Sequence, residues 1–202
     1  MARPRSSRAH QAVIDAARDL FAEHGIDRTS MDAIARLSGV SKATIYNHWP
    51  DKDALCLAVM AELHGLDESL EDVDTGDLRQ DLLAVAGRRP PDEFANARQR
   101  ILPHFMAHAS KNPAFGHAWR ARVLEPPREQ VVRVIRRAIA RGELPADLNL
   151  DFAVGLLLGP PMYWYMRRQI IPASPGPSDF DPEWLVNVFM RALSVPAPSG
   201  GA

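Results

Sequence analysis

The sequence predicts an all-α protein, and three observations support this fold class. Apolar residues recur at helical spacing along most of the 202 residues. No segment shows the alternation of apolar and polar residues that is typical of a half-buried strand. Glycine, proline and hydroxylated residues stand where helices would begin and end. With 46% hydrophobic and 24% charged residues, the chain has enough apolar side chains for a sizeable core.

Local signals bound the first helices. The first helix is expected over residues 8–24, because its apolar residues follow the i, i+3, i+4, i+7, i+8 pattern, and Gly25 would end it. Thr29 or Ser30 can accept a free backbone N–H at the start of a second helix over residues 31–38. Gly39 can take the left-handed conformation that ends this helix, and Ser41 would cap a third. The apolar residues of the first helix are Val13, Ala16, Ala17, Leu20 and Phe21.

The remaining helices are longer and less sharply marked. The third ends at Trp49-Pro50, because the residue before a proline is disfavoured in the helical region, and Asp51 begins a fourth. We expect about nine helices in all, and a disordered tail over residues 195–202, which are rich in Pro, Ser, Gly and Ala. The later helices are expected over 78–86, 91–111 with a kink at Pro103, 112–142 with an interruption at Pro126-Pro127, 150–171 and 182–193.

Residues 30–49 place two short helices around a glycine-containing turn, which is typical of a helix-turn-helix. In that motif the second helix lies in the major groove of DNA and its N-terminal residues face base edges. Ile45 and Trp49 are four residues apart and would point into the core, which leaves small and hydrogen-bonding side chains on the opposite face. We expect base contacts from Lys42, Ala43, Thr44 and Asn47, and phosphate contacts from Thr29, Ser30, Tyr46, His48 and Lys52. Ser41, the cap of the third helix, is also expected at the DNA surface.

The same residues resemble a known family. The pattern Thr29-Ser30-Met31-x-x-Ile34-Ala35, then Gly39-Val40-Ser41-x-x-Thr44-Ile45-Tyr46-x-His48-Trp49-Pro50-x-Lys52-x-x-Leu55, is similar to the N-terminal domain of tetracycline-repressor-type (TetR family) regulators. Looser motifs beyond Arg137 resemble the effector domain of one subgroup. Many relatives carry Arg or Tyr in place of Asn47, which concerns the preferred DNA sequence rather than the fold.

The resemblance implies a division into a DNA-binding domain over residues 1–60 and a ligand-binding and dimerisation domain over residues 61–194, linked by the fourth helix. It further implies an Ω-shaped homodimer that represses by default at a pseudopalindromic operator. A small hydrophobic or aromatic ligand would release it by changing the separation of the two heads. The heads would need half-sites about 34–36 Å apart, or a multiple of that distance.

An aromatic and aliphatic set in the middle helices is either plain core or, as the resemblance favours, the lining of this ligand pocket. The candidate lining residues are Phe94, Leu102, His104, Phe105, Met106, His108, Phe115, Trp119 and Tyr163. His104 and His108 stand four apart, which is also a metal-ligand spacing that His64 and His117 could complete. Without a carboxylate or thiolate pattern nearby, we expect no metal and no cofactor.

The last two helices carry apolar residues on more than one face, and Gly155-x-x-x-Gly159 would allow another helix to approach closely. The resemblance implies that these helices form the dimer contact, against the alternative of core within one chain. The interface candidates are Gly155, Leu156, Leu157, Gly159, Trp184, Val188 and Phe189.

Composition and motifs exclude other classes of protein. The net charge of −1 argues against a general nucleic-acid binder, although residues 62–81 are acidic and residues 98–141 basic; we expect both to be solvated surfaces. No Gly-rich phosphate loop, HExxH or Gly-x-Ser-x-Gly motif is present, and the single Cys56 is expected to be buried and inert, so no enzyme is expected. No signal peptide or membrane span is visible.

These expectations describe a cytoplasmic regulator that associates with the nucleoid when it is bound to DNA. Two alternatives remain open from the sequence. The chain could be a helical dimer that binds a small molecule or a protein and has little operator affinity, or it could activate transcription rather than repress it.

Overall fold

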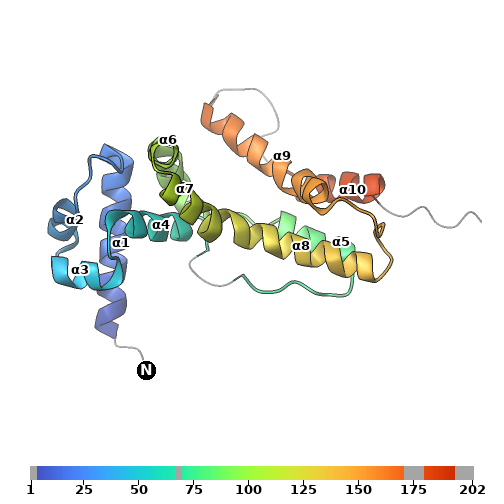
Figure 1. Cartoon of the computed structure of the whole chain (residues 1–202), viewed down its shortest axis with the longest axis horizontal. Coiled ribbons are helices and arrows are strands. Elements are labelled where there is room, and N and C mark those ends of the chain that lie inside the picture. Colours follow the sequence, from blue (N-terminus) through green and yellow to red (C-terminus); the bar gives the residue numbers. More distant parts are fainter. Residues whose placement is uncertain (1–3, 67–69, 171–179, 194–202) are drawn as a thin grey trace, which may run out of the picture. The chain divides into compact units, whose positions relative to one another are not determined.

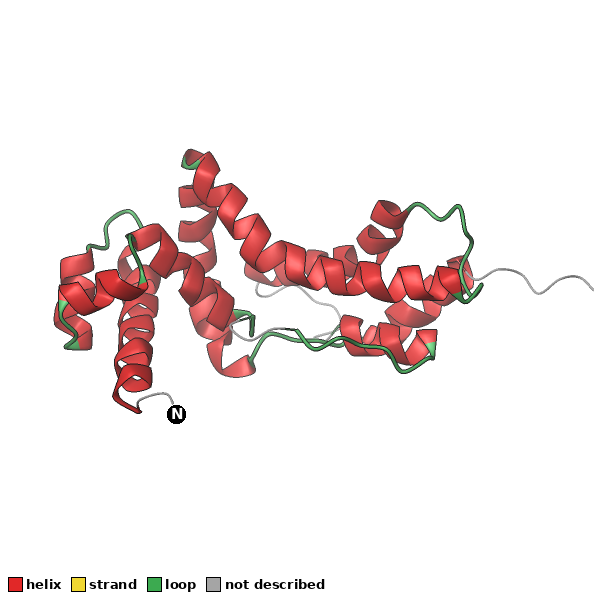
Figure 2. Cartoon of the chain, turned by 60° about the horizontal axis from the view of Figure 1, so that its bottom comes forward, coloured by secondary structure: helices red, strands yellow, loops and turns green. Residues whose placement is uncertain are grey.

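The structure, a computed structural model, describes residues 4–66, 70–170 and 180–193. Within these ranges all regular secondary structure is helical (Figures 1 and 2), which confirms the all-α class. The loop expected over residues 172–178 and the tail expected over residues 195–202 lie outside the described residues. The α-helices are α1 (Pro4–His24), α2 (Met31–Ser38), α3 (Lys42–His48), α4 (Lys52–Leu63), α5 (Leu78–Ala86), α6 (Ala95–Lys111), α7 (Pro113–Trp119), α8 (Glu125–Ala140), α9 (Leu150–Ile170) and α10 (Pro182–Leu193).

Short polar side chains start the helices of the N-terminal region. The Oγ of Ser30 accepts the backbone N–H of Ala33 at the start of α2, and the Oγ of Ser41 accepts that of Thr44 at the start of α3. Asp51 caps α4 in the same way. Gly39 ends α2 with φ +68°, the left-handed conformation that favours glycine. The predicted boundaries of α2 and α3 and the predicted start of α4 are therefore confirmed.

The helix over residues 113–140 departs from expectation at Pro126-Pro127, where no break occurs. Helical residues run continuously from α7 through a π-helical stretch, η2 (Arg120–Leu124), into α8. Proline has no N–H with which to bond the preceding turn, and π-helical pairing just before the two prolines accommodates that loss without ending the helix. With a 3₁₀ turn, η1 (Asp92–Phe94), joined to α6, the described ranges contain nine separate helical stretches.

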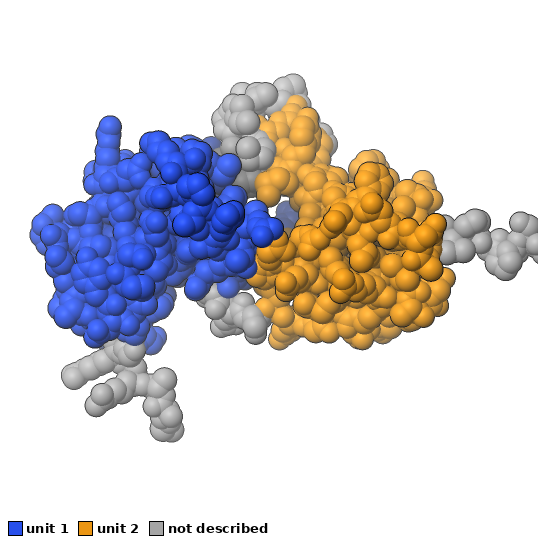
Figure 3. All heavy atoms as spheres, viewed as in Figure 1, with its two compact units in different colours: residues 1–69, 89–124 blue, residues 70–88, 125–202 orange. Residues whose placement is uncertain are grey.

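The helices form two compact units, coloured separately in Figure 3. Unit 1 comprises residues 1–69 and 89–124, and unit 2 comprises residues 70–88 and 125–202. The expected domain boundary at residue 60 therefore does not divide the compact units, because η1, α6, α7 and η2 pack with α1 to α4. The core of unit 1 joins these helices through side chains that are at most 1% exposed: Phe21, Ile34, Ile45, Leu55, Ile101 and Phe105.

Unit 2 is built from α5, α8, α9 and α10, which contact one another around a separate apolar core. Its most deeply buried side chains come from all four helices, and each is at most 2% exposed. They include Leu82, Val134, Ile135, Ala153, Leu157, Val186 and Phe189.

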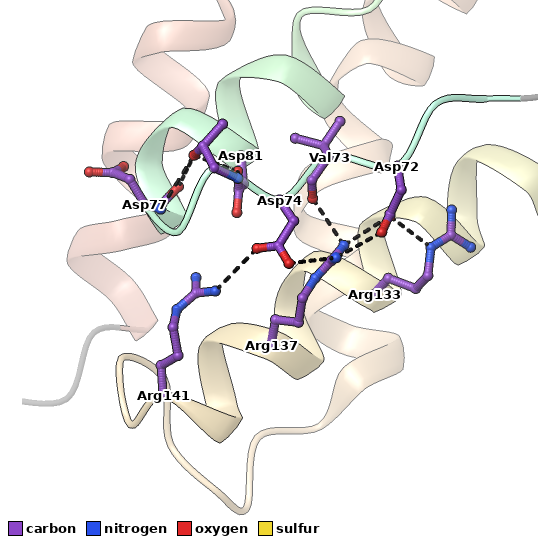
Figure 4. Close-up of polar contacts among 9 residues, drawn as sticks. Asp72, Val73, Asp74, Asp77, Asp81, Arg133, Arg137 and Arg141 are labelled. Carbon is purple, nitrogen blue, oxygen red and sulfur yellow. Dashed lines mark hydrogen bonds and ion pairs between the residues drawn. The ribbon is translucent and has the colours of Figure 1, made fainter.

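Unit 2 also shows where the acidic and basic blocks of the sequence meet. The Arg137 guanidinium bonds both Asp72 oxygens, at 2.8 and 2.9 Å, and the Val73 carbonyl at 2.9 Å (Figure 4). Asp72 also accepts from Arg133, and Asp74 pairs with Arg137 and Arg141. The Arg137 hydrogen bond is the main reason why the pKa of Asp72 is lowered to about 2. The two blocks stay partly solvated, as expected, with Asp72 and Asp74 about half exposed, but they also pair with each other. Two arginines of α8 and Arg141, the residue after its end, bind the segment before α5.

Across the described ranges, no helix combines the length and the apolar character needed to cross a lipid bilayer.

Candidate nucleic-acid interface

Helix α3 has a buried face that anchors it in the core of unit 1, called the anchoring face, and an opposite exposed face, called the presenting face. Ile45 and Trp49 are 1% and 5% exposed and belong to the core of unit 1. The opposite face consists of side chains that are exposed, apart from Thr44, which is half-buried. The exposed side chains are Ser41, Lys42, Ala43, Tyr46, Asn47 and His48. Because the anchors are rigidly packed, the presenting face is held in one orientation relative to α1 and α2.

The first turn of α3 is tied internally. Besides capping the helix, the Ser41 Oγ lies 2.9 Å from the Thr44 Oγ1. The Lys42 Nζ lies 2.5 Å from the Asp32 carboxylate of α2, which raises the pKa of Lys42 and lowers that of Asp32. Both side chains are more than half exposed, so this ion pair is weak. Sequence reasoning missed Asp32 because nothing local in the chain indicates its pairing with Lys42.

Thr29 does not present its hydroxyl to solvent, which corrects its predicted phosphate contact. The residue is 4% exposed, and its Oγ1 donates to the Gly25 carbonyl at 2.8 Å and lies 3.2 Å from the Leu20 carbonyl. Of the two candidate caps, the exposed Ser30 starts α2. Thr29 instead fastens the α1–α2 turn to the end of α1.

Lys52 is also turned inward, which corrects its predicted role at a phosphate. Its Nζ donates to the backbone carbonyls of Ile26, Asp27 and Thr29 at 2.6, 3.3 and 3.0 Å. These three bonds use all the donors of an ammonium group. Lys52 thus connects the start of α4 to the turn that leads into α2.

A ring cluster lies at the C-terminal end of α3. The His10 ring of α1 is centred 4.6 Å from the Trp49 ring and 5.8 Å from the His48 ring. Partial burial, and next the neighbouring His48, lower the pKa of His10, which favours its neutral form. His48 itself is exposed, and its neighbour His10 is a residue of this surface that sequence reasoning missed, because their pairing depends on how α1 packs against α3.

The ligand-pocket candidates fall into different environments. Phe105 and Phe115 are buried in the core of unit 1, with ring centroids 5.1 Å apart and the ring planes inclined by 55°, and Phe94, Leu102 and Trp119 are half-buried. Trp119 lies edge-on to Phe105, and its Nε1 is buried without a hydrogen-bond partner among the described residues. Met106 and His104 are exposed, as is Tyr163 of unit 2. His108 is buried, but carboxylates rather than apolar groups face its ring nitrogens.

The dimer candidates divide into core and surface. Leu157 and Phe189 are 1% and 2% exposed in the core of unit 2, which corrects their assignment to an interface. Trp184 and Val188 are 64% and 42% exposed. Gly155 and Gly159 are exposed and Leu156 is half-buried. Phe152 and Met162, which sequence reasoning missed, are 62% and 51% exposed on α9.

The histidines proposed as alternative metal ligands do not form a metal site in the described ranges, where no group of three His, Cys, Asp or Glu side chains could hold an ion. The single cysteine, Cys56, is fully buried in the core of unit 1, and burial raises the pKa of its thiol.

Comparisons with known proteins agree with this geometry. Residues 13–59 match the family model described as bacterial regulatory proteins, tetR family, and residues 72–175 match the model of a tetracyclin repressor-like C-terminal domain. The chain is 30% identical to the uncharacterized HTH-type transcriptional regulator YdeS of Bacillus subtilis over 162 residues, 80% of each chain.

A second sequence relative matches a shorter part of the chain, and a solved structure shares its fold. The DNA-binding transcriptional repressor TetR of Mycobacteroides abscessus is 31% identical over 140 residues, 68% of this chain and 72% of its own. A crystal structure of the TetR family transcription regulator SCO0332 superposes with a TM-score of 0.55 at 27% identity, over 91% of this chain and 96% of its own.

The capped α2–turn–α3 segment with its exposed polar face, in an all-α chain, defines a helix-turn-helix DNA-binding transcriptional regulator. More particularly, the chain belongs to the TetR family, whose members bind operator DNA. This is a family of regulators and not of enzymes, in line with the absence of catalytic motifs from the sequence.

Proposed function

We propose that the protein is a homodimeric repressor that binds a pseudopalindromic operator through α3 and leaves it when a small hydrophobic or aromatic molecule binds. The observation that carries the proposal is the face of α3 that presents Lys42, Ala43, Tyr46, Asn47 and His48 to solvent while Ile45 and Trp49 anchor it. The protein would act in the cytoplasm, where its DNA is.

The internal contacts of the N-terminal region divide the residues by role. Asn47 and Lys42 read base edges, with Ala43 and the Thr44 methyl group in apolar contact, since an Asn amide pairs bidentately with adenine. Ser30, Ser41, Tyr46 and His48 bind phosphates. Thr29 and Lys52 act indirectly, because their polar atoms already bind the α1–α2 turn.

An apolar face of unit 2 supports dimerisation. On α9 the exposed positions Phe152, Gly155, Gly159 and Met162 are three, four and three residues apart, so they follow one side of the helix. Trp184 and Val188 are likewise four apart on α10. Large apolar side chains exposed at such spacing favour a subunit interface, and a second copy of this chain is the occupant we propose.

The aromatic cluster of unit 1 supports the effector proposal. A buried indole N–H without a partner is costly in free energy. An acceptor on a ligand would satisfy the Trp119 Nε1, while the apolar part of the ligand packs on the Phe105–Phe115 pair. A mainly apolar ligand with one oxygen or nitrogen acceptor fits this chemistry.

The proposal can be tested with labelled DNA taken from upstream of the protein's own gene. Binding of the protein to this DNA is measured by fluorescence anisotropy at a series of salt concentrations. We expect salt-sensitive, sequence-selective binding, and Asn47→Ala should lose about 1–3 kcal/mol of discrimination at one base pair per half-site. Affinity for random DNA should hardly change in this variant. If the wild-type protein binds all sequences equally, or binds none, the repressor proposal fails and the alternative of a helical ligand-binding dimer stands.

A further inference from the structure

Helix α6 presents a row of basic side chains to the α1–α2 turn of the same unit. His104, His108 and Lys111 are four and three residues apart, so they share one face of the helix. The His104 ring lies over Gly25, within 3.0 Å of the place where a Cβ would stand. The His108 Nδ1 lies 2.6 Å from the Asp27 Oδ1, and the Lys111 Nζ lies 3.6 Å from the Asp27 Oδ2. The turn that leads into α2 thus rests on α6.

His108 also reaches a second element. Its Nε2 lies 3.0 Å from the Asp53 Oδ1 in the first turn of α4, and its ring packs edge-on against Phe115 at 4.7 Å. The residue is 6% exposed. An imidazolium carries an N–H on each ring nitrogen, so the charged ring can donate to both carboxylates at once. Hydrogen bonding to His108 is the main cause that lowers the pKa of Asp27, which favours its ionised form.

The two carboxylates flank the segment that Lys52 already holds. Asp27 lies in the turn whose carbonyls accept from Lys52, and Asp53 follows Lys52 in α4. The turn between α1 and α2 is therefore fastened twice, once to α4 through Lys52 and once to α6 through His108. Movement of α6 that separates His108 from the carboxylates would release one of these fastenings.

We propose that His108 is a positioning residue for DNA binding, which bridges Asp27 and Asp53 and thereby couples α6 to the helix-turn-helix. The inference rests on the proposed function, and it specifies how the occupancy of a site near α6 reaches the DNA-reading helix. The composition of unit 1 supports it, because α6 is part of the same compact unit as α1 to α4 although the matched N-terminal family model ends at residue 59.

Hydrogen exchange of the DNA-free protein, combined with operator affinity, tests this coupling. The variants are His108→Gln, Asp27→Ala and the double variant, all measured well below their melting temperatures. We expect the amides of residues 25–30 to exchange about tenfold faster in each single variant, the low end for a charged hydrogen bond because Asp27 is half exposed. Operator affinity should fall in parallel. The double variant should be little worse than the stronger single variant, because each single variant already removes the His108–Asp27 contact.

His117→Gln is the matched control, because it makes the same chemical change at an exposed histidine of α7 and should alter neither readout. Asp53→Asn tests the second half of the bridge and should also speed exchange in the turn. Should His108→Gln not fold, Asp27→Ala carries the test, because the Asp27 side chain is 55% exposed and its loss is tolerable.

The inference is overturned if exchange in the turn is unchanged, if the two single effects add, or if exchange rises evenly over unit 1 while operator affinity stays constant. A wild-type protein that binds no operator would refute the proposed function instead. The exchange measurement would then still decide whether the His108 bridge holds the turn.

Discussion

Replacing Lys52 by methionine should destabilise the protein without changing the electrostatics of DNA binding. The side chain keeps its length but loses the ammonium that donates to the carbonyls of Ile26, Asp27 and Thr29. A hydrogen bond to a charged group contributes about 1.5–3 kcal/mol when well buried. The bond to Asp27 is exposed and the other two are only partly buried, so we expect a total loss of about 2 kcal/mol.

For a protein of this length such a loss lowers the melting temperature by about 4–8 °C, which thermal denaturation followed by circular dichroism can resolve. The matched control is Lys42→Met, which removes an exposed ammonium paired only with Asp32 among the described contacts. It should leave the melting temperature nearly unchanged, but it should weaken operator binding and change the preferred sequence, because we assign Lys42 to a base edge.

Measured below its melting temperature, Lys52→Met should keep the wild-type salt dependence of operator binding. The Lys52 ammonium that it lacks bonds backbone carbonyls and does not neutralise a DNA phosphate. A melting temperature of Lys52→Met equal to that of the wild type, together with a weaker salt dependence of its operator binding, would refute this reasoning. Lys52 would then be a phosphate contact, as the sequence alone predicts.

Three other predictions follow from single contacts. Ser30→Ala and Ser41→Ala each remove the acceptor for a first-turn N–H of α2 or α3 and should cost about 1 kcal/mol of unfolding free energy. Ser110→Ala, at an exposed position in the last turn of α6 where no N–H of the described residues depends on the hydroxyl, should cost less. The pKa of Asp72 is lowered to about 2 by Arg137, so its contribution is present above the unfolded pKa of about 3.9 and is lost as the pH falls toward 2; Asp72→Asn should flatten the acid side of the stability profile over that range, and an unchanged profile would contradict the ion pair. Cys56 is fully buried, so a thiol reagent should label it only as fast as the protein opens, and rapid stoichiometric labelling of the native protein would show that the core of unit 1 is not closed.

The predictable part of this fold is the part governed by neighbours in sequence. The ends of α2, α3 and α4 depend on Ser30, Gly39, Ser41 and Asp51, each of which acts within four residues through its own hydroxyl, carboxylate or backbone conformation. The anchoring face of α3 follows from helical periodicity for the same reason. These features require no knowledge of the tertiary structure.

The orientation of polar side chains could not be predicted in this way. Whether Thr29 and Lys52 point toward DNA or into the turn depends on where residues 25–29 lie in space, and both orientations satisfy the same sequence pattern. His108 meets Asp27 and Asp53 across 81 and 55 residues of chain. Arg137 meets Asp72 across 65 residues. Such pairings are set by helix packing, so a sequence with alternating acidic and basic blocks indicates only that partners exist.

The burial of Leu157 and Phe189 shows a similar limit. Periodicity places them on apolar faces of α9 and α10, but both helices have apolar residues on more than one face. Only the packing of α5 and α8 against them decides which face is internal. The side chains left exposed, Phe152, Trp184 and Val188, therefore define the proposed subunit interface more narrowly than the sequence does.

Hydroxyl-radical footprinting on DNA selected by the protein from genomic fragments tests the central claim most directly, namely that two copies of α3 read an operator together. We predict two protected patches on one side of the duplex, centred about 10–10.5 base pairs apart or a multiple of that spacing. Asn47→Ala should weaken both patches equally, because each comes from an identical head. A single protected patch, or protection that does not depend on sequence, would contradict the account.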